Sequence, residues 1–221
     1  MAANMTDLYR RAVRLIKSHP LFVLLVSGVV SRLILMPAVA VSWDTGVYVS
    51  DSLQILNGGI PLVDYPSRSP LFHHYLAMWL KVFENNVLGA RIAVMATAVG
   101  VAILVYVMGR EVHSRNAGLI ATALFLFTPI SALYGITVKT QFASAIFGLL
   151  AVFLLVRLYE GGRRRSIAFV LVGNCLGLGF LVRRVVIAYV LAAVAFTFAA
   201  VLYSRGSFSD FSVGWLRRSI R

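Results

Sequence analysis

Long apolar runs separated by short polar stretches dominate this chain. Six of the runs approach the roughly 17–25 residues that a helix needs to cross a bilayer: 21–41, 89–108, 117–133, 142–158, 167–182 and 185–203. Another segment, 71–83, is too short and too polar to span, so we expect it to lie along the membrane interface. The pattern predicts an all-α polytopic membrane protein with about six transmembrane helices and short interfacial helices in the first loop.

The composition agrees with a membrane protein. Hydrophobic residues make up 60% of the chain, above the roughly 45–50% of soluble domains. The chain has 21 Lys and Arg residues against 8 Asp and Glu residues, and such basicity can indicate nucleic-acid binding. Here the charges stand in short clusters between apolar runs, as they do in membrane loops. We therefore expect no nucleic-acid partner.

The distribution of Lys and Arg predicts the orientation, because these residues concentrate in cytoplasmic loops. If six spans alternate, thirteen lie on the side of the termini, and the other side keeps five: Arg68, Lys81, Lys139, Arg183 and Arg184. Both termini are thus expected in the cytoplasm. The predicted organisation is a basic amphipathic segment at 1–20, a transmembrane domain at 21–203 with its first extracytoplasmic loop at 42–88, and a basic cytoplasmic tail at 204–221.

The most informative polar stretch lies within that first loop. It holds three of the chain's eight acids: Asp44, Asp51 and Asp64. A short helix is expected from Ser42, a suitable N-cap, to a stop signal at Gly58-Gly59. Prolines at three later positions favour an extended connection: Pro61, Pro66 and Pro70. A membrane protein so poor in acids has little structural need for carboxylates at this place.

This loop resembles the first extracytoplasmic loop of the GT-C membrane glycosyltransferases, the relatives of protein mannosyltransferases and aminoarabinose transferases. The matching positions are Asp44, Tyr48, Leu56, Gly59, Pro61-Leu62, Asp64 and Pro70-Leu71. Weaker matches downstream extend the resemblance over most of the chain. The resemblance implies a hexosyl- or pentosyltransferase of the cell membrane, which passes a sugar from a polyprenyl-phosphate donor to an acceptor at the outer face.

The resemblance also implies roles for individual residues. Asp44 is the expected general base, which would take the proton of an acceptor hydroxyl as the oxygen attacks. Position alone favours a capping or first-turn role for Asp44, and the surrounding pattern reverses this in favour of catalysis. Tyr48 and Asp64 are expected to contact substrate, although Asp64 among its prolines is as well suited to forming a turn. Asp51 is expected to be a solvated helix residue.

Two departures from the family pattern bear on the mechanism. Thr45 stands where the family's acidic pair has its second acid, and the loop 134–141 has no acid, with Gln141 in the relevant place. Both departures weaken a two-carboxylate or metal-assisted mechanism. We therefore expect no required cofactor, and a divalent metal is without support. The adjacent His73-His74 pair is a poor metal site, because neighbouring helix residues point about 100° apart.

A lipid-linked phosphate donor requires cations at the outer face. Lys139, Arg183 and Arg184 are the candidates, since these side chains can bind phosphate oxygens. Simple anchoring at the interface is the alternative. Arg32, inside the first apolar run, should face the bundle interior, and Gly173 and Gly177 are expected to permit close helix packing.

Three further interpretations remain open from the sequence alone. The chain is shorter than the family's enzymes, so it could be the N-terminal part of one, completed by a partner chain or by a missing C-terminal part. A divergent relative could also bind lipid-linked sugar or scaffold a partner without catalysis. A small transporter is the last alternative, and it would use charges at mid-membrane, for which Arg32 is the candidate.

Overall fold

The computed structural model of the protein describes residues 18–84, 86–159 and 165–204. Nine α-helices form this part of the chain, which confirms the all-α prediction there. Most of the basic segment 1–20 and of the tail 204–221 lies outside the described residues. The helices are α2 (Pro20–Leu35), α3 (Trp43–Leu56), α4 (Pro70–Val82), α5 (Val87–Val112), α6 (Arg115–Phe127), α7 (Pro129–Tyr134), α8 (Gln141–Tyr159), α9 (Arg165–Val182) and α10 (Ile187–Ser204), with 3-10 turns η1 (Met36–Ala38) and η2 (Arg184–Val186).

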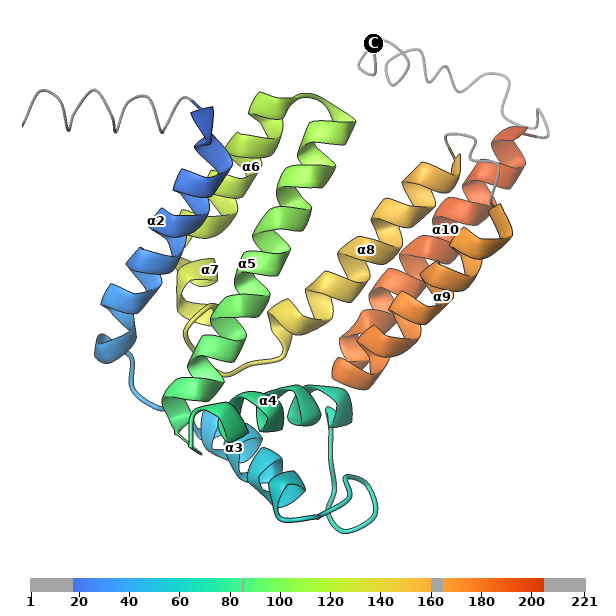
Figure 1. Ribbon diagram of the computed structural model, residues 1–221. Coiled ribbons are helices and arrows are strands. Elements are labelled where there is room, and N and C mark those ends of the chain that lie inside the picture. The colour runs from blue at the N-terminus through green and yellow to red at the C-terminus, as the bar shows by residue number, and fades with distance from the viewer. Residues whose placement is uncertain (1–17, 85, 160–164, 205–221) are drawn as a thin grey trace, which may run out of the picture.

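The long helices stand beside one another, and α3 and α4 lie across the lower end of this bundle (Figure 1). Helix α5 packs against α6 and α8, and α8 packs against α9. Helix α4 contacts α3, α5 and α9, so it joins the crosswise layer to the bundle. The links from α7 to α8 and from α9 to α10 reach the same end as this layer (Figure 1).

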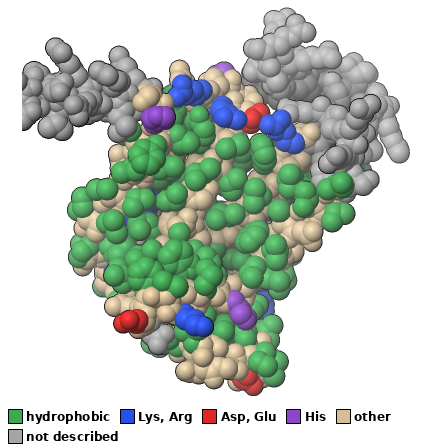
Figure 2. Space-filling model, viewed as in Figure 1, with side chains coloured by type: hydrophobic (Ala, Val, Ile, Leu, Met, Phe, Trp, Pro, Cys, Tyr) green, Lys and Arg blue, Asp and Glu red, His purple; other side chains and the backbone are tan. Residues whose placement is uncertain are grey.

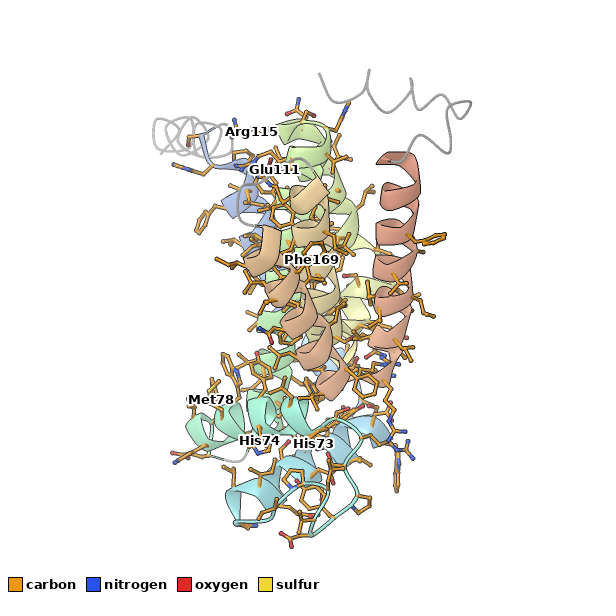
Figure 3. All side chains as sticks on the ribbon, turned by 90° about the vertical axis from the view of Figure 1, so that its right-hand side faces the viewer. His73, His74, Met78, Glu111, Arg115 and Phe169 are labelled. Carbon is orange, nitrogen blue, oxygen red and sulfur yellow. The ribbon has the colours of Figure 1, made fainter. Side chains whose placement is uncertain are left out.

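A band of hydrophobic side chains surrounds the middle of the bundle, as Figure 2 shows for one face. Charged groups gather at both ends. At the end opposite α3 and α4, Glu111 pairs with Arg157 at 2.9 Å and with Arg110 at 3.3 Å, and Figure 3 labels Glu111 and Arg115 there. An apolar band between charged rims is the surface expected for a protein surrounded by lipid.

Length and composition identify two stretches long and apolar enough to cross a membrane, Pro20–Ala38 and Val87–Val112. Three further apolar helices are shorter: Arg115–Phe127, Gln141–Arg157 and Phe169–Val182. The structure thus supports a helical protein with apolar, membrane-length segments. The number of six spans stays a prediction.

The run 117–133, predicted as one helix, is two helices that meet at Thr128–Pro129. Proline cannot donate a backbone hydrogen bond and pushes the preceding residue out of the α region. Thr128 accordingly has φ −63° and ψ 130°. The expectation of a continuous span was wrong, and the break lets α7 lead into the loop before α8.

Arg32 connects α2 to α7 inside the bundle. Its side chain is 1% exposed. The guanidinium donates to Gly28 O at 3.0 Å and to both Ser131 O and Ser131 Oγ at 3.3 Å. A Cβ on Gly135 would collide with Arg32 Nε, so glycine is required where the chain leaves α7. The prediction that Arg32 faces the interior is confirmed.

The glycines of α9 do not all pack as expected. A Cβ on Gly173 or Gly177 would meet no described atom within 4 Å, so the prediction of close helix packing there was wrong. Gly179 is the tightly packed position instead, because its Cβ would lie 3.1 Å from Phe147 Cβ and from Val186 Cγ1. This contact holds the end of α9 against α8 and η2.

Candidate functional site

Helix α3 begins as the sequence predicts. Ser42 is its N-cap, and the Ser42 side chain accepts a hydrogen bond from Thr45 N at 3.3 Å. The Ser42 and Thr45 hydroxyl oxygens lie 3.0 Å apart, and Thr45 is buried. Asp44 points outward from the same turn with its side chain 55% exposed. Where the family has a second acid, this chain therefore has a structural hydroxyl.

The entry to α3 is held by an arginine that the sequence had not marked as important for the site. Arg91 of α5 is 9% exposed and donates to Met36 O at 2.9 Å and to Val39 O at 2.7 Å. Met36 opens the 3-10 turn η1 after α2, and Val39 follows this turn with an extended backbone. Arg91 thus fixes the path of the chain just before Asp44.

Asp44 meets Lys139 at the lower end of the bundle. Lys139 Nζ lies 3.4 Å from Asp44 Oδ2, and the lysine side chain is 27% exposed. The ammonium also lies 5.3 Å from the centre of the Tyr134 ring, a geometry that favours a cation–π contact. The structure therefore brings together two of the predicted site residues, one from the first loop and one from the loop before α8.

A hydrophobic cluster fixes the positions of these two loops relative to each other. It contains buried residues from α3, α4, α5, the loop before α8, α8 and the end of α9: Val49, Phe72, Leu76, Leu80, Val94, Val138, Ala143 and Val182. Val138 directly precedes Lys139. Burial of the larger of these side chains contributes about 1.5–3 kcal/mol each to folded stability. The cluster therefore holds Asp44 and Lys139 on a rigid scaffold.

Tyr48 packs against α4. Its ring meets Phe72 edge-on at 5.3 Å between centroids, and it lies 5.6 Å from the His73 ring. The Tyr48 side chain thus helps to fasten α3 to α4. A direct contact between Tyr48 and substrate stays a prediction.

Asp51, His73 and Ser67 form a buried polar cluster that sequence reasoning missed. Ser67 Oγ lies 3.0 Å from His73 Nδ1, and His73 Nε2 lies 3.7 Å from Asp51 Oδ2. The side chains of His73 and Asp51 are 1% and 18% exposed, so Asp51, which was expected to be a solvated helix residue, is partly buried against α4. Figure 3 shows His73 on α4 at this end of the molecule.

Burial sets the protonation of this cluster. Burial, with a smaller contribution from His74, lowers the pKa of His73 to about 4. Burial also raises the pKa of the Asp51 carboxyl. A neutral His73 has a single N–H. If Ser67 donates to Nδ1, that N–H is on Nε2 and points toward Asp51.

Asp64 closes a turn. Its Oδ2 accepts a hydrogen bond from Ile60 N at 2.7 Å. The turn is further tied by Leu62 N to Tyr65 O at 2.9 Å, with Leu62 at a φ of 70°. This geometry favours the turn-forming alternative for Asp64 over contact with acceptor.

Arg183 and Arg184 lie where α9 turns into α10. Arg183 is partly buried, and Arg184 is exposed. The preceding Val182 belongs to the same hydrophobic cluster as Val49 of α3. The two arginines therefore share the end of the bundle that carries Asp44. Within the described chain neither has a carboxylate within 4.0 Å.

A groove of about 520 Å³ runs along the outer face of α3. It is lined by Val41, Ser42, Trp43, Gly46, Val47, Ser50 and Asp51. The groove and the Asp44 side chain therefore belong to the same helix.

Comparison with known proteins decides the family. Residues 67–216 match the dolichyl-phosphate-mannose-protein mannosyltransferase family. The chain belongs to this family. The predicted resemblance to GT-C glycosyltransferases is thereby confirmed. Proteins of this mannosyltransferase family are integral membrane proteins that use dolichyl-phosphate-mannose as donor. No curated protein and no solved structure matches the chain.

The mannosyltransferase match covers Lys139, Arg183 and Arg184 and begins after Asp64. The roles of Asp44, Tyr48 and Asp64 therefore stand on the first-loop pattern and on the geometry. Gln141, in place of a family acid, opens α8 with its Oε1 buried and without a hydrogen-bond partner. Among the described residues no three His, Cys, Asp or Glu side chains gather as metal ligands would.

Proposed function

We propose that this protein transfers mannose from a polyprenyl-phosphate donor to a hydroxyl group of a polypeptide at the extracytoplasmic face. The acceptor oxygen forms a bond to the anomeric carbon as the bond from that carbon to the phosphate oxygen breaks. Asp44 takes the acceptor proton, and the polyprenyl phosphate leaves with the bonding electrons. The observation that carries this proposal is the ion pair between Asp44 and Lys139.

The pair gives Asp44 the properties of a positioned base. Lys139 engages Oδ2 at 3.4 Å, so the other carboxylate oxygen is free to accept the proton of a bound hydroxyl. General bases of this kind contribute about 10²–10⁴-fold to rate. The pair is partly exposed, so its value lies in orientation, since exposed ion pairs contribute only about 0–1 kcal/mol to stability.

Lys139 also bears on the cofactor. Its ammonium already lies against Asp44, at the place where a metal ion would have to sit to share that carboxylate. A cation entering there would meet electrostatic repulsion. We infer that the reaction requires no metal, and that the phosphate of the donor is held by Arg183 and Arg184 of the same end of the bundle.

The proposed orientation puts this end outside the cell membrane. Six spans with both termini in the cytoplasm would place Asp44, Lys139, Arg183 and Arg184 on the outer face. The opposite end carries Arg110, Arg115 and Arg157, which agrees with the preference of basic residues for the cytoplasmic side. Arg32 is bound to Gly28 and Ser131, which removes the main support for a transporter.

The experiment is sugar transfer by the purified full chain in lipid nanodiscs. The donor is a mannosyl polyprenyl phosphate, and the acceptor is a threonine-containing peptide. Asp44→Asn keeps the size of the side chain and removes the base, so transfer should fall at least 100-fold. The matched control is Glu84→Gln, an acid in the turn after α4, which should keep transfer within twofold. Wild-type transfer by Asp44→Asn would disprove the assignment.

A further inference from the structure

The groove along α3 is built from one face of the helix. Trp43, Gly46, Val47 and Ser50 stand at helical spacing along it, and Asp51 forms its edge. The Trp43 side chain is 87% exposed, so its ring is available to a ligand. A Cβ on Gly46 would meet nothing within 4 Å, so the floor of the groove is open.

Asp51 supplies the groove with an incompletely paired carboxylate. Its Oδ2 lies 3.7 Å from His73 Nε2, longer than a hydrogen bond, and the Tyr65 hydroxyl nearby donates to the backbone oxygen of Asp51 at 3.0 Å. Burial keeps His73 neutral at physiological pH, with its pKa near 4. Within the described chain no Lys or Arg lies within 4.0 Å of this carboxylate. A half-buried carboxylate without a cation is costly, and a cationic ligand would remove that cost.

Trp43 strengthens the preference for a cation. Indole rings attract ammonium and guanidinium groups that lie over their faces. A phosphate or another anion would instead be repelled by Asp51. An aromatic surface and a carboxylate lining one groove therefore select a positively charged side chain.

The position of the groove connects it to Asp44. Asp44 and Asp51 are seven residues apart on α3, so they lie on nearly the same edge of the helix, about 10.5 Å apart along its axis. An extended polypeptide covers about 3.3–3.6 Å per residue. A ligand that reaches both carboxylates therefore spans about three residues.

We propose that the α3 groove binds a lysine or arginine side chain of the acceptor polypeptide, about three residues from the hydroxyl that receives the sugar. Asp51 and Trp43 are the specificity-determining residues. This inference rests on the proposed function, because it takes Asp44 as the place of the reacting hydroxyl. It adds the chemistry of the acceptor, which neither the family nor the ion pair at Asp44 specifies.

The test measures peptide binding without donor, using the full chain in nanodiscs of neutral phosphatidylcholine. The probe is a fluorescent peptide, Ala-Thr-Ala-Ala-Lys-Ala, and its partner carries uncharged norleucine in place of lysine. Fluorescence polarisation should show at least fivefold tighter binding of the lysine peptide. Asp51→Asn should bind both peptides equally, whereas the control Glu84→Gln should keep the preference.

A steric variant tests the location. Gly46→Leu places a side chain in the groove, where its Cβ meets no described atom within 4 Å, and should weaken binding of both peptides. Gln54→Leu, at an exposed position of α3 that does not line the groove, should not. Equal binding of the two peptides by the wild-type chain would overturn the inference, as would a lysine preference that survives in Asp51→Asn. The first of these results is expected if the groove contacts the membrane surface instead.

Failure of this inference is distinguishable from failure of the proposed function. Asp44→Asn should bind the lysine peptide as the wild-type chain does, while losing transfer. Transfer that depends on Asp44 but shows no lysine preference would overturn the acceptor inference alone. A lysine preference together with transfer that ignores Asp44 would overturn the proposed base alone.

Discussion

Acidification should destabilise this protein through the buried side chain of His73. The His73 ring is 1% exposed, and burial lowers its pKa from 6.5 to about 4. Between these pH values the unfolded chain binds more protons at His73 than the folded chain does. The contribution of His73 to folded stability is therefore fully present above pH 6.5 and is lost as the pH falls toward 4. From pH 7.5 to pH 4.5 the loss from this single group is about 2.5 kcal/mol.

Other groups contribute in different directions. Burial raises the pKa of Asp51, so the folded chain takes up a proton there before the unfolded chain does, and this partly offsets the loss on acidification. The contribution of His73 must therefore be isolated by comparison of variants. His73→Gln cannot titrate and can still hydrogen-bond to Ser67. His74→Gln, at the exposed neighbouring position, is the matched control.

The assay is reversible unfolding in mixed micelles at pH 7.5 and pH 4.5. The drop in unfolding free energy between the two pH values should be about 2.5 kcal/mol smaller in His73→Gln than in the wild-type chain. In His74→Gln it should stay close to the wild-type drop and be only slightly smaller, because His74 is the lesser cause of the lowered His73 pKa. An equal drop in His73→Gln and wild-type protein would refute the conclusion that His73 is buried in its neutral form.

Three further results are expected. Gly135→Ala should lower the unfolding free energy by about 1–3 kcal/mol, because its Cβ meets Arg32. Gly173→Ala should be neutral or stabilising by up to about 1 kcal/mol. Equal effects of the two substitutions would contradict the packing described for Gly135 and Gly173. The double substitution of Arg183 and Arg184 by Gln should raise the KM for the donor at least tenfold and leave the KM for the acceptor nearly unchanged. An unchanged donor KM would show that both arginines serve only as anchors at the membrane interface. Chelation by EDTA should leave the transfer rate unchanged, and a rate restored only by added metal would contradict the role given to Lys139.

Local signals explain how much of the fold was predictable. The N-cap at Ser42, the stop at Gly58 and the short helix after Pro70 follow from side-chain chemistry that acts over a few residues. Arg32 could be placed in the interior because a charge in an apolar helix must find polar partners. Asp44 could be singled out because the family pattern that marks it lies within one continuous loop.

Most of what the sequence did not show depends on contacts between distant segments. The sequence could not show that Lys139 pairs with Asp44, because the pairing depends on how the loop before α8 packs on α3. Asp51 looks like a solvated helix residue until α4 brings His73 beside it. The break at Thr128–Pro129 had a visible signal, the proline, but hydropathy alone ran through it.

The most direct test of the account is a double-mutant cycle on Asp44 and Lys139, measured as kcat/KM for sugar transfer in nanodiscs. If Lys139 works by orienting the base, Lys139→Met lowers kcat/KM in the wild-type chain and has no further effect once Asp44→Asn is present. The predicted activity of the double variant is therefore that of Asp44→Asn alone. Effects that multiply would contradict the claim that the two residues act as one catalytic unit.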